Sequence, residues 1–87
     1  MRSAKLREAL CVEVVRILHD ERERKKISMI RLAEQSGLSQ SMISLVERDL
    51  RNPTLDTLLR VTDALEIELS DVLVKAKRIA SRRMSQG

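Results

Sequence analysis

The sequence predicts an all-α fold, and three observations lead to that prediction. Apolar residues recur at intervals of three and four through most of the 87-residue chain. No segment alternates apolar and polar residues as a half-buried strand does, and capping or helix-stopping residues separate the periodic stretches. We expect one compact five-helix domain over residues 1–81, with an extended first helix, and a basic tail over residues 82–87 that frays because it lacks apolar periodicity.

The first expected helix is long and amphipathic. Its apolar positions repeat at close to the 3.6-residue helical period. They are Leu6, Leu10, Val14, Ile17 and Leu18. We expect this helix to end near Glu23, within the highly charged run HDERERKK.

Two short helices follow, each introduced by a serine. Ser28 is expected to cap a helix over residues 29–35 and Ser39 one over residues 40–48, because a serine hydroxyl accepts from an otherwise unpaired amide. Gly37 lies in the turn between them, where glycine takes a positive φ without steric cost. The scaffold of this helix-turn-helix core, residues 28–48, is expected to include Ala33, Gly37, Ile43 and Val46.

Sequence signals also mark the start of the fourth and fifth helices. Asn52-Pro53-Thr54 ends one helix and begins another, because proline disfavours helical geometry in the preceding residue and threonine is a good cap. Apolar residues over 55–65 give the fourth helix a wide buried face. Ser70 and Asp71 are expected to begin the fifth helix. Its apolar stripe is Leu69, Val72, Leu73, Ala76, Ile79 and Ala80.

Composition argues against several classes of protein. Without Phe, Tyr or Trp, the chain lacks the stacking platforms of single-strand and RNA binders. Cys11 and His19 are its only soft metal ligands, so we expect neither a metal site nor a cofactor. The sequence contains no nucleophile paired with a base and no glycine-rich phosphate loop, so we do not expect an enzyme. Since no apolar run would span a membrane and the N-terminus is charged, we expect a cytoplasmic protein, with no small-molecule ligand evident.

Charge is distributed unevenly along the chain. The net charge is +4, with eight Lys and Arg against five acids in residues 1–26, four against eight in residues 27–74, and five against none in residues 75–87. A basic protein suits a polyanionic partner, but here the central region is acidic. Charge alone is therefore weak support for such a partner.

Residues 14–74 resemble the lambda-repressor-like family of DNA-binding domains, also called the Xre or Cro-type helix-turn-helix. The motifs LAEQSGLS, ISLVER, RNPTLDTL and DALEIELSDVL carry the resemblance, in this order and at matching spacing. The resemblance implies a five-helix domain whose third helix lies in the major groove of double-stranded DNA. It also implies a sequence-specific transcriptional regulator.

The base-reading residues are expected on the exposed face of the third helix. Glutamine pairs with adenine, serine bonds either kind of base pair, and leucine meets a thymine methyl group. The expected readers are Gln40, Ser41, Ser44 and Leu45. Phosphate contacts, which position without specifying sequence, are expected from Ser28, Lys26, Arg31, Arg48, Arg51 and Asn52. For Lys26 and Arg31, a solvated surface charge is an equally good interpretation.

Two further expectations follow from the resemblance. Glu47 is expected to pair with Arg22 near the end of the first helix, as the corresponding glutamate does in the family, and so to brace the third helix. Met29 stands where the family usually has a glutamine that contacts phosphate or the third helix. That contact should be missing here, or supplied by Ser28 or backbone amides.

A homodimer on a palindromic operator is expected, because one short helix reads only about four or five base pairs. The expected dimer interface is Leu69, Val72, Leu73, Ala76 and Ile79. The alternative is that Leu69, Val72 and Leu73 close the monomer core. A second function also stays open: an antitoxin-like or regulator-binding protein–protein interaction module with weak or no DNA binding. The acidic centre and Met29 favour it.

Overall fold

Five helices make up the structure, a computed structural model that describes residues 4–48 and 52–86. They are α1 (Ala4–Arg24), α2 (Met29–Ser36), α3 (Gln40–Glu47), α4 (Leu55–Ala64) and α5 (Leu69–Gln86). No strand occurs among the described residues. The predicted all-α fold class is confirmed, and none of the described helices has the length and apolar character needed to cross a membrane.

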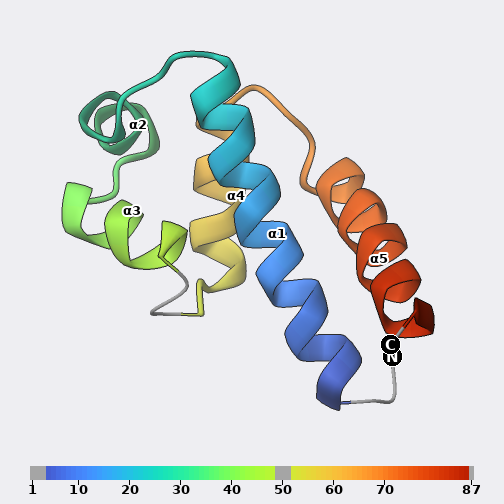
Figure 1. Ribbon diagram of the computed structural model, residues 1–87. Helices are drawn as coiled ribbons and strands as arrows, with labels where there is room; N and C mark the ends of the chain where they lie inside the picture. The colour runs from blue at the N-terminus through green and yellow to red at the C-terminus, as the bar shows by residue number, and fades with distance from the viewer. Residues whose placement is uncertain (1–3, 49–51, 87) are drawn as a thin grey trace.

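The helices pack around α1, the longest of them (Figure 1). The other long helix, α5, packs mainly against α1, while α3 packs against both α1 and α2, and α2 also contacts α4. Apolar side chains from all five helices meet in one core, in which Leu32, Ile43 and Leu65 are fully buried. Burial of such side chains is the main stabilising contribution in a domain this small.

Side chains cap three of the helices where the sequence predicts caps. The Ser28 hydroxyl accepts from the Arg31 amide at 3.1 Å, and the Ser39 hydroxyl accepts from the Met42 amide at 3.0 Å. The Thr54 hydroxyl accepts from the Thr57 amide at 3.1 Å. Each bond satisfies an amide that the helix itself leaves unpaired, and stabilises the helix by about 1 kcal/mol.

Two helices end in the same backbone motif without a glycine. Lys26 after α1 and Glu66 after α4 adopt left-handed geometry, with φ of 57° and 59°. The amide of the following residue then donates a hydrogen bond to a carbonyl near the end of the helix. Ile27 donates to the Arg22 carbonyl at 3.1 Å, and Ile67 donates to the Thr62 carbonyl at 3.0 Å. Both isoleucines pack against the core. These bonds and contacts compensate for the strained backbone.

The structure corrects two expectations about α5. The helix begins at Leu69, so Ser70 lies inside its first turn and is not its cap. Instead, the Glu68 carbonyl accepts from the amides of Asp71 and Val72, at 3.1 and 3.2 Å.

The helix also continues to Gln86, whereas fraying was expected from residue 82. The reason is an ion pair with α1: Arg83 Nη1 lies 3.1 Å from Glu13 Oε2. Glu13 is buried, with 3% of its side chain exposed, and also pairs with Arg16. Because a buried carboxylate is costly without cationic partners, the pair favours continuation of α5 along α1.

Candidate nucleic-acid interface

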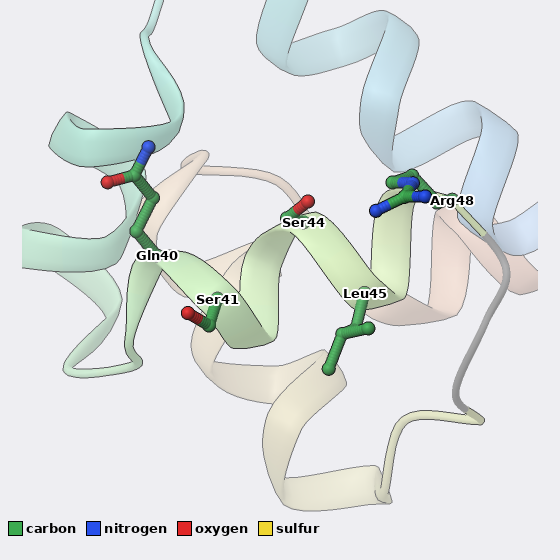
Figure 2. Close-up of a pocket in the computed structure, with 5 residues that line it drawn as sticks. All are labelled: Gln40, Ser41, Ser44, Leu45 and Arg48. Atoms are coloured by element: carbon green, nitrogen blue, oxygen red, sulfur yellow. The ribbon is translucent and has the colours of Figure 1, made fainter.

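One face of α3 points away from the rest of the protein and carries the expected reading residues. Gln40, Ser41, Ser44, Leu45 and Arg48 line a single open hollow of about 420 Å³ (Figure 2). Four of them project from α3, with Gln40 in its first turn, and Arg48 is the C-cap residue directly after the helix. Gln40, Ser41 and Arg48 are exposed, and Ser44 and Leu45 are half-buried. Arg48, expected at phosphate, therefore shares the surface of the four expected base readers.

The opposite face of α3 is fixed to the protein by apolar packing. Ile43 and Val46 are 2% and 4% exposed. Ala33 of α2, also buried, belongs with Ile43 to the common core. These residues occupy the scaffold positions expected from the sequence, so α3 has a buried side that sets its orientation and an open side that does not contribute to the core.

A hydrogen-bonded ion pair joins α3 to α1, as the resemblance implied. Arg22 Nε and Nη2 donate to the two carboxylate oxygens of Glu47, at 2.6 and 2.9 Å. Arg22 Nη1 donates to the Ile27 carbonyl at 2.7 Å, so the same guanidinium also holds the connector that leads into α2. His19 Nδ1 lies 2.8 Å from Glu47 Oε1. We call Arg22, Glu47 and His19 the brace.

The brace changes the acidity of Glu47. Burial alone would raise the pKa of this carboxyl, whose side chain is 7% exposed. Hydrogen bonds and charge attraction from Arg22 and His19 outweigh burial, so the pKa lies below its ordinary value of 4.5. Glu47 is therefore ionised at neutral pH, and it acts as internal support on a helix whose outer face is uncharged apart from Arg48.

The turn between α2 and α3 depends on Gly37. It has φ of 77°, and its amide donates to the Ala33 carbonyl at 3.0 Å, which closes the end of α2. A Cβ atom at this position would lie 3.1 Å from Arg60 Nη1, which itself donates to the Ser36 carbonyl at 3.4 Å. The left-handed backbone favours glycine here, and an added Cβ would also oblige the end of the Arg60 side chain to shift.

Most residues expected to contact phosphate lie at the surface. Lys26, Arg31, Arg48 and Asn52 are exposed, as is Ser28. Within the part of the chain that the structure describes, the side chains of Lys26, Arg31 and Arg48 form no ion pair, so their charges are not neutralised there. Arg51 lies outside the described residues. Met29 packs against the core, so its side chain serves the interior.

The structure divides the expected dimer interface. Leu69, Val72 and Ala76 are 8%, 4% and 0% exposed and belong to the monomer core, so they offer no surface to a partner. Ile79 is half-buried and lines a hollow between α1 and α5. Leu73 is 40% exposed. Most of the stripe therefore packs against the rest of the monomer, whereas Leu73 remains exposed.

Three side chains make contacts between elements that the sequence does not predict: His19, Lys25 and Arg60. His19, a soft metal ligand by its residue type, contacts Glu47 instead. Arg60 closes the end of α2, and Lys25 Nζ donates to the Leu65 carbonyl at the end of α4. The C-terminal end of a helix attracts a positively charged side chain. The sequence alone does not show which lysine or arginine lies close to which helix end.

Comparison with known proteins agrees with this geometry. The family model described as helix-turn-helix matches residues 18–72, which include α2, α3 and α4 entirely. The chain therefore belongs to the lambda-repressor-like helix-turn-helix family of DNA-binding domains, whose members are regulators and not enzymes.

Individual relatives point the same way. The chain is 36% identical over 69 residues to an uncharacterised HTH-type transcriptional regulator of Mycobacterium tuberculosis, covering 79% of this chain and 49% of the relative. It is 37% identical over 73 residues to the HTH-type transcriptional regulator SlrR of Bacillus subtilis, covering 83% and 47%. It is 40% identical over 52 residues to the immunity repressor protein of Bacillus phage phi105, covering 60% and 36%. The chain thus spans about half or less of these relatives.

A solved structure shares the fold over most of its length. The clp gene regulator ClgR from Corynebacterium glutamicum superposes with a TM-score of 0.77 at 27% identity. The similarity covers 88% of this chain and 82% of that chain. The overall fold of this chain is thus one known from a crystal structure.

Proposed function

We propose that this chain binds double-stranded DNA sequence-specifically and regulates transcription as a homodimer on a palindromic operator, with α3 in the major groove. The single observation that carries the proposal is the outer face of α3. Four side chains that suit base edges and one cation share that face, on a helix whose other side is locked by the core and the brace. Such a helix presents its readers in a fixed orientation, which base recognition requires.

Contacts to the DNA backbone are assigned to the residues around α2 and to the end of α3. The Ser28 hydroxyl oxygen already accepts from Arg31, which leaves its proton free to donate to a phosphate oxygen. Lys26, Arg31 and Arg48 carry exposed charges that suit phosphate. Arg51 and Asn52 complete the proposed set. These contacts would orient α3 in the groove without selecting sequence.

The homodimer is proposed because a single α3 reads too few bases to select an operator. Two copies related by a two-fold axis double the contacts and match a palindrome with half-sites about one helical turn apart. The similarity to a phage immunity repressor supports repression as the mode of regulation. Each copy would contribute the same five-residue face of α3.

Selection of bound duplexes from a random pool tests the proposal. We expect enrichment of a palindrome whose half-sites are separated by about one turn, with binding that weakens steeply as salt is added because counterions return to the phosphates. Enrichment of a single non-repeated site would contradict the dimer. Failure to enrich any duplex would contradict DNA reading and favour the protein–protein interaction module.

A further inference from the structure

Three cations form a row along one side of α5. Lys75, Arg78 and Arg82 are three and four residues apart, so a helix places them on the same side. All three are exposed, and none forms an ion pair within the described residues. We call these three residues the basic row. At a rise of 1.5 Å per residue, the row extends for about 10 Å along the helix.

The helix itself does not neutralise the basic row. Asp71 lies one turn before Lys75, and the rest of α5 after Asp71 contains no acid. Lys75 lines a hollow with Asp71 and with Glu68 of the preceding connector, but pairs with neither. Arg78 and Arg82 lie further along the helix and do not line that hollow. The positive charge of the row is therefore least compensated at its two arginines.

The neighbouring acids of α1 mostly have cationic partners already. Arg83 Nη1 lies 3.1 Å from Glu13 Oε2, and Arg24 pairs with Glu21. Each of these ion pairs occupies a carboxylate that could otherwise neutralise the row. Asp20, which lines the hollow between α1 and α5, forms no ion pair within the described residues. The basic row thus keeps a net positive charge beside α1.

The basic row is separate from the proposed DNA-reading face. Helix α5 packs mainly on α1, and α1 lies between α5 and α3 (Figure 1). The hollow assigned to DNA is lined by residues of α3 and by its C-cap residue, so the two surfaces share no residue. A duplex held on α3 is therefore separated from α5 by α1. Phosphates that contact the row would come from a different segment of DNA.

We propose that the basic row binds the phosphate backbone of a second segment of duplex DNA without reading its sequence. Each strand of a duplex has a phosphate for about every 3.4 Å of axis, so three cations spread over about 10 Å can meet several phosphates. Contacts of this kind supply affinity but no sequence preference. The chain then holds two DNA segments together, one on α3 and one on α5; holding the first of them rests on the proposed function.

Duplex DNA suits the basic row better than other polyanions do. Single strands bind by stacking on aromatic side chains, and the chain has none. Helices that bind anionic membranes have a broad apolar face beside their cations. The exposed residues next to the row on α5 are Val74, Ser81 and Ser85, of which one is apolar. The surface beside the row therefore favours phosphates in water over a lipid surface.

Capture of one duplex by another tests the proposal. A duplex with the palindrome enriched from the random pool is immobilised, saturated with the full chain, washed and then offered a labelled duplex of unrelated sequence. The wild type should retain the labelled duplex. The triple variant Lys75→Gln, Arg78→Gln, Arg82→Gln should retain at least about tenfold less, because its phosphate contacts are lost. No capture by the wild type, or equal capture by this variant, would overturn the inference.

A second triple variant, Lys5→Gln, Arg7→Gln, Lys77→Gln, is the matched control. It removes the same charge at exposed positions that form no ion pair within the described residues. Lys77 lies on a different side of α5 from the row, since two residues turn a helix by about 200°. The control should capture the labelled duplex within about twofold of the wild type. Equal losses in the two triple variants would show that net charge, and not the row, is responsible. Circular dichroism establishes that each variant is folded.

The salt dependence of binding to a duplex without the palindrome gives a second measure. Each phosphate contact contributes about 0.9 to the slope of log affinity against log salt concentration. Loss of the basic row should therefore reduce that slope by about two to three, and the control variant should leave it nearly unchanged. A slope that the row variant does not reduce would contradict the proposed contacts.

Two further outcomes separate this inference from the proposed function and from membrane binding. If the random pool yields no palindrome but the salt slope still depends on the row, the proposed function fails and the inference stands. If the row variant prefers the palindrome as the wild type does and captures no second duplex, both stand. Binding to phosphatidylserine vesicles that the row variant loses, while its duplex binding is unchanged, would assign the row to a membrane surface and overturn the inference.

Discussion

Gln40 illustrates how a single residue on α3 is suited to reading DNA. Its side chain projects from the first turn, the part of a recognition helix that enters the groove most deeply, and it is exposed. We predict that Gln40→Ala lowers affinity for the preferred duplex by about 1–3 kcal/mol and relaxes base preference at one half-site position. Fluorescence anisotropy with duplexes substituted at each position measures both effects.

Arg31→Ala is the control for that prediction. Arg31 is exposed and proposed to contact phosphate, so its loss should weaken binding to every duplex by a similar factor and reduce the salt dependence. Equal losses on all duplexes for Gln40→Ala would contradict its assignment as a base reader.

Gly37 supplies a second prediction at the residue scale. An alanine there must adopt φ near 77° and place its Cβ 3.1 Å from Arg60 Nη1. We expect Gly37→Ala to lower the free energy of unfolding by about 1–2 kcal/mol, measured by urea denaturation. Gln35→Ala, an exposed change within α2, should be nearly neutral. Comparable losses in the two variants would show that the left-handed turn is not the cause.

At the scale of the elements, the brace makes the attachment of α3 to α1 dependent on pH. Because the folded protein holds the pKa of Glu47 below 4.5, the ionised carboxylate stabilises the fold above that value. The stabilisation is lost as pH falls through the lower, folded pKa. Glu47→Gln should therefore destabilise the protein at neutral pH, and the difference from wild type should shrink below about pH 4.5.

Thermal or urea melts across acidic and neutral pH measure this difference. Glu34→Gln serves as the control, since Glu34 is exposed on α2 and forms no ion pair within the described residues. It should leave stability nearly unchanged over the same range. A loss for Glu47→Gln that stays constant with pH would contradict the role of its charge.

How much of each element could be predicted depended on whether its determinants are local. The caps at Ser28, Ser39 and Thr54 involve residues three positions apart, so the sequence alone locates them. The left-handed geometry of Lys26 and Glu66 could not be predicted, because neither residue is glycine. It is held by hydrogen bonds to the preceding helical turn and by the isoleucine that follows each residue and packs in the core. Local propensity was overridden there by packing.

On the scale of the whole molecule, the end of α5 depends on a contact with α1. Arg83 lies beside the buried carboxylate of Glu13, so Arg83→Ala should lower the free energy of unfolding by about 1 kcal/mol. Arg82→Ala is the matched control, because Arg82 is exposed and unpaired within the described residues. Chemical denaturation compares the two, and equal effects would mean that net charge, not the ion pair, matters.

The candidate site was foreseen from the sequence to different extents. Gln40, Ser41, Ser44 and Leu45 could be grouped because helical periodicity alone places them on one face. The sequence left two uses open for Leu69 and Val72, a dimer interface or the monomer core, and the structure places both residues in the core. Periodicity alone could not decide between them, because it does not say which neighbour an apolar face meets. The partnership of Arg83 with Glu13 likewise depends on the packing of two helices from opposite ends of the chain.

The residues on the outer face of α3 are separate from the residues that hold this helix in the domain. The five residues that line the hollow are separate from Ile43 and Val46, which hold the helix in the core, and from Glu47, which braces it. Replacing the five would therefore leave in place the residues that hold α3 in the domain. Under the proposed function, these five side chains determine which operator is preferred. Substitutions among them can therefore create new specificities with little loss of stability.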